Sequence, residues 1–133
     1  MRSTDLPQDG FMNWFPLNLN QQHRLLNRTP TKRGAFAVRS LQDYPRVRGQ
    51  SDIYSLGVGA NSIKGLYTRV KQMFSPGRSQ TTNNNILDEM RTRLLEISFE
   101  KTNANNAKAL VSTILNRFEL DHGELPPVVL HHH

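Results

Sequence analysis

Cysteine is absent from the 133-residue chain. This absence excludes disulfide bonds, thiolate zinc sites and cysteine nucleophiles. Histidine is scarce as well, since His23 and His122 are separated by almost the whole chain, and His131, His132 and His133 are typical of the remains of a purification tag. Two isolated histidines without a His-Glu-x-x-His spacing do not predict a zinc site. We therefore expect no resident metal and no cofactor in the sequence as written.

Long apolar runs are missing too. No window approaches the roughly 18 consecutive apolar residues that a membrane-spanning helix needs. The polar segment 1–10 lacks the hydrophobic stretch of a secretory signal. The sequence thus predicts a cytoplasmic protein with no membrane partner, and it leaves the oligomeric state open.

The size and composition of the chain predict one small domain. Hydrophobic residues make up 36% of the 133 positions, enough for one modest core and too few for a two-domain enzyme. We divide the chain into an N-terminal arm (1–30), a folded domain (31–128) and a tail with the tag remnant (129–133). The arm is rich in Asn, Gln, Asp and Pro, so we expect little regular structure before residue 20.

Positive charge is concentrated in the first part of the chain. Residues 1–79 hold 12 basic and 4 acidic side chains, whereas residues 80–133 hold 5 and 7. Arginine outnumbers lysine by 12 to 5, and the planar guanidinium suits phosphate better than an ammonium group does. This asymmetry favours a nucleic-acid partner, although a basic surface also serves solubility alone.

The order of hydrophobic patterns predicts an α+β fold. Residues 34–40 and 53–58 are expected to form a β-hairpin with a long loop, and residues 94–100 alternate in the manner of a third strand. Apolar residues at helical spacing predict a helix that is capped by Asn61 or Ser62 and ends at Pro76-Gly77. A polar loop over 75–85 and a short helix over 86–93 should follow, and Asn103 or Thr102 should cap a long helix that ends at Gly123. The simplest architecture is a small three-stranded sheet flanked by helices.

Glycines between the second strand and the first long helix superficially suggest a phosphate-binding loop. The stretch 57–65 lacks the Gly-Lys-Ser ending, so Walker-type nucleotide binding is excluded. A helix N-terminus near Ser62, with Lys64 close by, still offers free backbone N–H groups to an anion.

The order and spacing of these pieces resemble the GIY-YIG nuclease superfamily from Gly34 to Pro127. Gly34-Ala-Phe36 stands where that family has Gly-Ile-Tyr, and Ser55-Leu-Gly57 stands where it has Tyr-Ile-Gly. Arg69 stands at the arginine of the family's first helix, and the segment Ala107–Val111 is similar to its closing helix, with Pro126-Pro127 behind it.

The resemblance implies metal-assisted hydrolysis of a phosphodiester. It implies that a hairpin tyrosine activates water, that the arginine holds the phosphate, and that a glutamate of the closing helix binds one divalent ion, Mg²⁺ or Mn²⁺. At these positions the chain has Phe36 without a hydroxyl, Ser55 without a ring and Val111 without a carboxylate. Tyr54 lies one residue from the motif position, and only a β-bulge would bring it to the same face of the sheet.

We therefore expect a nuclease-derived domain that binds nucleic acid, with DNA as the expected type, and that is weak or inactive in hydrolysis. Arg69 and Tyr54 are the remaining candidate catalytic residues. The residues expected to contact nucleic acid are Lys64, Arg69, Lys71, Arg46, Arg48 and Arg78.

Two alternatives stay open. The first is an active endonuclease with an altered site made of Tyr54 or Tyr67, Arg69 and a carboxylate such as Glu119, with a divalent ion. The second is a non-catalytic interaction module whose aromatic arm, with Phe11, Trp14 and Phe15, docks a protein partner.

Overall fold

The computed structural model describes residues 1–60 and 62–129. The strands are β1 (Phe15–Leu17), β2 (Gly34–Pro45), β3 (Gln50–Gly59), β4 (Leu95–Lys101) and β5 (Val128–Val129). The α-helices are α1 (Gln22–Arg28), α2 (Gly65–Phe74), α3 (Thr81–Met90) and α4 (Ala104–His122). Two 3₁₀-helices, η1 (Ser3–Asp9) and η2 (Leu19–Gln21), lie near the N-terminus. The fold is α+β, as predicted.

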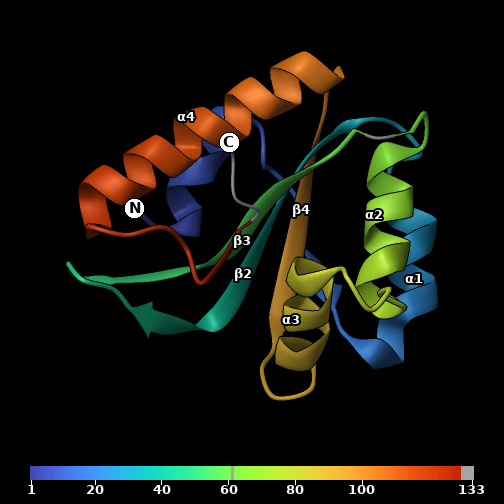
Figure 1. Cartoon of the computed structure of the whole chain (residues 1–133), viewed down its shortest axis with the longest axis horizontal. Helices are drawn as coiled ribbons and strands as arrows, with labels where there is room; N and C mark the ends of the chain where they lie inside the picture. Colours follow the sequence, from blue (N-terminus) through green and yellow to red (C-terminus); the bar gives the residue numbers. More distant parts are fainter. Residues whose placement is uncertain (61, 130–133) are drawn as a thin grey trace.

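A five-stranded mixed sheet with the order β1-β4-β2-β3-β5 forms the centre of the molecule. Strand β2 pairs antiparallel with both β3 and β4, β1 pairs antiparallel with β4, and β5 runs parallel to β3. Helices α1, α2 and α3 lie on one side of the sheet, and α4 with η1 lies on the other (Figure 1).

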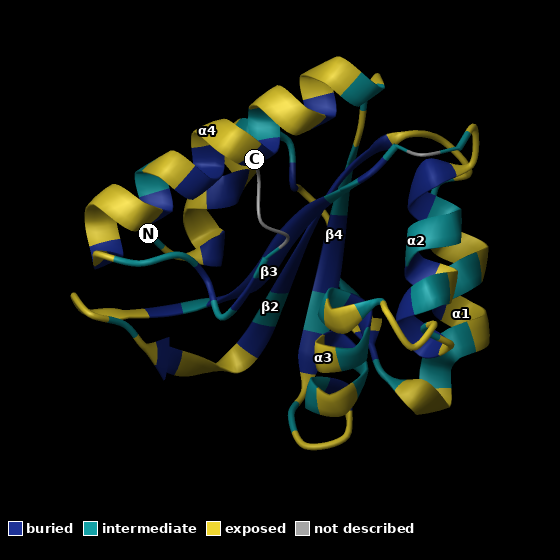
Figure 2. Cartoon of the chain, in the orientation of Figure 1, coloured by how far each residue is buried: buried dark blue, intermediate teal, exposed yellow. Residues whose placement is uncertain are grey.

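Each face of the sheet carries its own hydrophobic core. The α2 core is built on residues such as Phe36, Val38, Leu66, Val70 and Ile97. The α4 core is built on residues such as Ala35, Ala37, Leu56, Val111 and Leu115. Successive side chains of β2 alternate between the two cores, because neighbouring residues of a strand point to opposite faces. The central strand is therefore buried on both sides, as its continuous apolar sequence predicts (Figure 2).

Helix α4 begins and ends at the predicted residues. The side chain of Asn103 caps the helix by accepting a hydrogen bond from the N–H of Asn106 at 2.8 Å. At the other end Gly123 has φ = 77°, a left-handed conformation that favours glycine. Buried and exposed residues alternate along α4 with the period of a helix, so only one side of the helix faces the sheet (Figure 2).

The prediction of little regular structure before residue 20 is wrong. Helix η1 and strand β1 form there, and Leu6, Phe11 and Leu17 are buried. The segment thus adds strand β1 to one edge of the predicted three-stranded sheet, and β5 adds a strand to the other. Both added strands are too short to show an alternating pattern in the sequence, so only pairing with β4 and β3 reveals them.

Three predicted boundaries also differ. Strand β2 extends to Pro45 and strand β3 begins at Gln50, so both strands of the hairpin are longer than predicted. The polar residues expected to end the first strand lie in a stretch of irregular pairing between Arg39 and Tyr44. Helix α2 begins at Gly65, which leaves Ile63 exposed; of the two predicted caps, Asn61 lies outside the described residues and Ser62 does not cap the helix. Helix α3 begins at Thr81, inside the segment expected to be a polar loop.

Candidate nucleic-acid interface

Arg69 occupies the side of α2 that faces the sheet. Its guanidinium carbon lies 5.3 Å from the ring centroid of Phe36, within the range of a cation–π interaction. Its Nε and Nη2 atoms are buried and have no hydrogen-bond partner among the described residues. No carboxylate of residues 1–60 or 62–129 forms an ion pair with it.

This arrangement leaves the charge of Arg69 uncompensated. Burial lowers the pKa of its guanidinium, because the charged form loses hydration without gaining an anion. By contrast, half-buried Arg39 pairs with Glu96 at 2.7 Å, and Arg117 pairs with Asp9 at 2.8 Å. An anionic ligand at Arg69 would supply the missing partner.

Arg69 lies at the wall of a large cavity in the described part of the chain. The cavity has a volume of about 720 Å³. Its lining combines one cation, seven amide or hydroxyl side chains and three apolar residues: Arg69, Gln72, Ser79, Gln80, Thr81, Thr82, Asn83, Asn85, Pro127, Val128 and Val129. None of these is acidic. A second, smaller cavity of about 140 Å³ shares Arg69 and Gln72 with the first.

Asn83 was missed by the sequence analysis. Its side chain is buried, with 1% of its surface exposed, and its Oδ1 has no hydrogen-bond partner among the described residues. The neighbouring amides fix its orientation: Gln80 Oε1 accepts a hydrogen bond from the Gly77 N–H at 3.1 Å, so the Asn83 atom 3.1 Å from this oxygen is the donor Nδ2. The polar composition of 75–85 predicts a loop, whereas Asn83 lies on α3, so no signal in the sequence marks a buried side chain here.

Two of the three substituted motif residues lie on the same face of the sheet as Arg69. Phe36 belongs to the α2 core and packs against Gly57, where an added Cβ would lie 2.7 Å from Cζ of the ring. Ser55 is opposite Val38, and its Oγ is buried without a partner among the described residues. Its register partner on the other side is Val128, which lines the large cavity.

Val111 lies on the opposite face. It is fully buried in the α4 core, among apolar residues of α4 and β3. The sheet therefore separates Val111 from Phe36 and Arg69, and the three positions do not line one concavity. A carboxylate at position 111 would enter an apolar core rather than a cavity beside Arg69.

A β-bulge is present at Tyr54. Val38 is opposite Ser55 and Arg39 is opposite Ile53, so Tyr54 is the extra residue of β3. The bulge places Tyr54 in the α2 core, on the face of Phe36. Its hydroxyl, however, donates to the carbonyl of Asn85 at 3.3 Å, and its ring lies 5.4 Å from that of Tyr44.

The residues of the altered-site alternative do not line a common cavity. Tyr54 is buried, and its environment raises the pKa of its phenol, mainly through burial and then through the nearby charge of Glu89. Tyr67 is half-buried on α2. Glu119 is exposed on α4 and lines a separate cavity with Arg46. Among the residues that the structure describes, no group of three or more His, Asp or Glu side chains could hold a metal ion.

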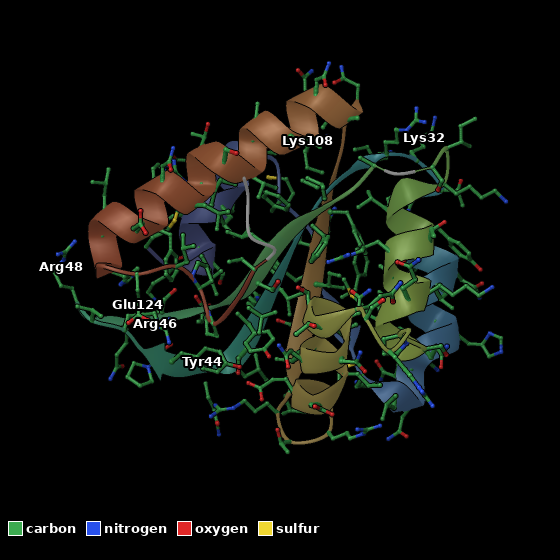
Figure 3. All side chains as sticks on the ribbon, in the orientation of Figure 1. Lys32, Tyr44, Arg46, Arg48, Lys108 and Glu124 are labelled. Atoms are coloured by element: carbon green, nitrogen blue, oxygen red, sulfur yellow. The ribbon has the colours of Figure 1, made fainter. Side chains whose placement is uncertain are left out.

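The predicted basic contacts divide into two groups. Lys64, Lys71 and Arg78 are exposed and form no ion pair within the described part of the chain. Arg46 pairs with Glu124 at 2.9 Å and donates to the Leu125 carbonyl. Figure 3 labels Arg46 and Glu124 next to each other near the tip of the hairpin. Arg48 donates to the carbonyl of Leu120. Arg46 and Arg48 thus fasten the hairpin to the end of α4.

The anion site predicted at the start of α2 is partly occupied by the protein itself. The N–H of Leu66 donates to the carbonyl of Lys32 at 2.9 Å. The carbonyl of Gly59 approaches Gly65 so closely that a Cβ on either glycine would overlap the other's backbone. This contact fixes the angle between β3 and α2, and leaves little room for a phosphate at this turn.

The segments that form α1 and α2 contain no acidic residue. The sequence contains no Asp or Glu in 10–42 or in 53–87. Those segments include α1, α2 and the loops beside them, with Lys32 near the start of α2 (Figure 3). The positive charge on this side is therefore not offset by acidic side chains from the same segments.

Comparisons with protein-family models, curated proteins and solved structures found no match. In the described ranges, no helix has the length and hydropathy required to span a membrane.

Proposed function

We propose that this domain binds nucleic acid through the phosphate backbone, on the side formed by α1, α2 and the start of α3, with Arg69 as the central phosphate contact. The observation that carries this proposal is the buried guanidinium of Arg69, which lacks an anionic partner among the described residues and lies at the wall of a cavity without acids. Burying an unpaired charge is costly, so the site is suited to a ligand that brings the anion.

The exposed bases support a polyanion rather than a single small anion. Lys64, Lys71 and Arg78 lie on α2 or in the loops beside it, and none is engaged by a described carboxylate. Exposed lysines and arginines attract a phosphate backbone over several ångströms, whereas Arg69 would form short, directional hydrogen bonds with one phosphate. The exposed bases would determine the salt dependence of binding, and Arg69 would determine the position of the nucleic-acid strand.

We also propose that the domain descends from a nuclease of the GIY-YIG type. Its expected ligand is DNA, which it would bind without hydrolysing it efficiently. Support comes from the element order β2, β3, α2, α3, β4, α4, which follows the predicted order, and from the shared face of Phe36, Ser55 and Arg69. Loss of activity is expected because Phe36 has no hydroxyl to activate water and no described carboxylate that could bind a divalent ion lines the cavity beside Arg69.

The interaction-module alternative is less well supported. Phe11 is buried in the α4 core, and Trp14 lies under Arg39, whose guanidinium carbon is 4.1 Å from the indole ring. Phe15 belongs to β1 and stacks on Phe99 with ring centroids 6.2 Å apart. The aromatic residues of the arm therefore pack against their own domain, and only Trp14 and Phe15, which are half-buried, keep some surface for a partner.

The proposal is tested by fluorescence anisotropy with labelled single-stranded and duplex DNA over a series of salt concentrations. Affinity should fall steeply as salt rises, because each phosphate contact releases counterions. Lys71→Ala should reduce the salt slope by roughly 0.7 to 0.9. Lys108→Ala, an exposed lysine of α4 on the other side of the sheet, is the matched control and should leave the slope unchanged.

Arg69→Gln tests the central contact. It should weaken binding by about tenfold or more, since it removes a charge-assisted hydrogen bond to phosphate. Circular dichroism should show that the variant remains folded. Equal affinity of wild type and Arg69→Gln, or equal slopes for Lys71→Ala and Lys108→Ala, would remove this side of the molecule from the interface.

A further inference from the structure

The large cavity has more polar residues in its lining than the binding of a phosphate requires. A phosphate bound to Arg69 needs a few donors, yet Gln72, Gln80, Asn83 and Asn85 also line the cavity. An amide offers a donor and an acceptor side by side, and this pairing matches the edge of a nucleobase. A volume of about 720 Å³ lies within the range of sites that enclose a small organic ligand.

We infer that this cavity binds one unpaired nucleotide, with its phosphate at Arg69 and its base against the amide side chains of α3. The inference rests on the proposed function and adds the structural state of the nucleic acid. A base can enter a recess only when it is unstacked and unpaired, so a duplex can offer this site its backbone but not its bases.

Asn83 is the residue that gives the site its hydrogen-bond character. Its Nδ2 is used by Gln80 Oε1 at 3.1 Å, and its buried Oδ1 is an acceptor without a partner among the described residues. Because this oxygen is buried, a base N–H reaches it only when the side chain turns toward the cavity. All four bases carry an N–H on the edge that pairing would otherwise occupy. The site therefore selects for an unpaired base more than for one base type.

The opposite wall of the cavity suits the face of a base. Pro127, Val128 and Val129 contribute the apolar part of the lining. Val128 is held in register with Ser55 of β3, so this wall is fixed by the sheet. An apolar wall and nearby amide residues together favour a flat ligand with polar edges, and Arg69 favours one with a negative charge.

The test compares three labelled probes of equal length on the intact protein: a single-stranded oligonucleotide, the same strand with abasic sites at every position, and a blunt duplex. The first two carry the same number of phosphates, so their difference reports the bases. The intact single strand should bind about tenfold more tightly than the abasic strand, because base contacts satisfy polar groups that otherwise remain unpaired. In competition, nucleoside monophosphates should displace the strand at lower concentration than inorganic phosphate does.

Two variants locate the effect. Asn83→Ala and Gln72→Ala should each reduce the preference for the intact over the abasic strand, while the affinity for the abasic strand stays the same. Asn105→Ala, an exposed asparagine of α4, should change neither value. If Asn83→Ala does not fold, the wild-type comparison of intact and abasic strands and the Gln72→Ala variant still decide the question.

The outcomes separate the two proposals. Equal, salt-dependent binding of the intact and abasic strands would overturn the nucleotide site and leave backbone binding intact. A preference for intact strands that Asn83→Ala and Gln72→Ala leave unchanged would place base recognition elsewhere and overturn the site as well. No binding of any probe would overturn the proposed function and, with it, this inference.

Discussion

The ring of Phe36 lies between Gly57 and Arg69. Its Cζ would be 2.7 Å from a Cβ added to Gly57, and the guanidinium carbon of Arg69 is 5.3 Å from its centroid. The absence of a side chain at position 57 therefore makes room for the ring that supports Arg69. A substitution at Gly57 should therefore also affect the environment of the Arg69 guanidinium.

Gly57→Ala is expected to destabilise the domain by about 1 to 3 kcal/mol, because the added methyl group must displace a fully buried ring. Gly77→Ala is the matched control, since its nearest non-neighbouring atom would lie 3.7 Å away, an ordinary contact. The control should be neutral or stabilising by about 0.4 to 1 kcal/mol. Urea denaturation measures both, and equal stability of the two variants would contradict the packing of Phe36 on Gly57.

Leu115→Ala is expected to lower the free energy of unfolding by about 2 to 5 kcal/mol, because it leaves a cavity in the α4 core. Leu115 is 4% exposed, whereas Leu120 on the same helix is 77% exposed. Leu120→Ala should change the stability by no more than about 0.5 kcal/mol. Thermal denaturation followed by circular dichroism distinguishes them, and an unmoved midpoint for Leu115→Ala would show that α4 does not pack on the sheet as described.

Tyr44 and Tyr54 should make the fold sensitive to alkali. The pKa of Tyr44 is raised mainly by burial and then by its hydrogen bond to Glu89 at 2.6 Å. The pKa of Tyr54 is raised mainly by burial and then by the negative charge of Glu89. Each raised pKa means that the folded state favours the neutral phenol. This contribution is fully present below the unfolded pKa of about 10 and is lost as pH rises through it, at up to about 1.4 kcal/mol per pH unit for each tyrosine.

Urea denaturation at about pH 9 and about pH 11, on either side of the ordinary tyrosine pKa, measures the effect. The double variant Tyr44→Phe with Tyr54→Phe should lose less stability between the two values than the wild type. Tyr67→Phe, a change at a half-buried tyrosine of α2, is the control and should behave as the wild type does. Identical pH profiles for all three proteins would show that the two buried phenols do not govern alkaline stability.

Restoring the family's residues is not expected to create a nuclease. Phe36→Tyr and Val111→Glu act on opposite faces of the sheet, since Val111 belongs to the α4 core and Phe36 to the α2 core. Val111→Glu should instead destabilise or unfold the domain by burying a carboxylate among apolar side chains. A plasmid-nicking assay with Mg²⁺ or Mn²⁺, together with circular dichroism, checks this. Metal-dependent nicking by a folded double variant, lost again on Arg69→Ala, would show that the two positions do cooperate.

Local sequence patterns predict the elements that are long and regular. The apolar run of β2, the alternation of Leu95, Ile97 and Phe99, and the helical spacing of α4 between Asn103 and Gly123 all predicted the observed structure. In each case local periodicity is imposed by burial on a defined face, so the pattern is present in the chain itself. The excess of bases over acids before residue 80 is likewise a property of the sequence.

How these elements combine depends on contacts between distant parts of the chain. Strands β1 and β5 exist through pairing with β4 and β3, and the bulge at Tyr54 follows from the register of β3 against β2. The same is true of the charges: Arg46 and Arg69 look alike in the sequence, yet one is neutralised by Glu124 and the other is buried without a carboxylate among the described residues. Side-chain partners come from distant segments, and only the folded chain brings them together.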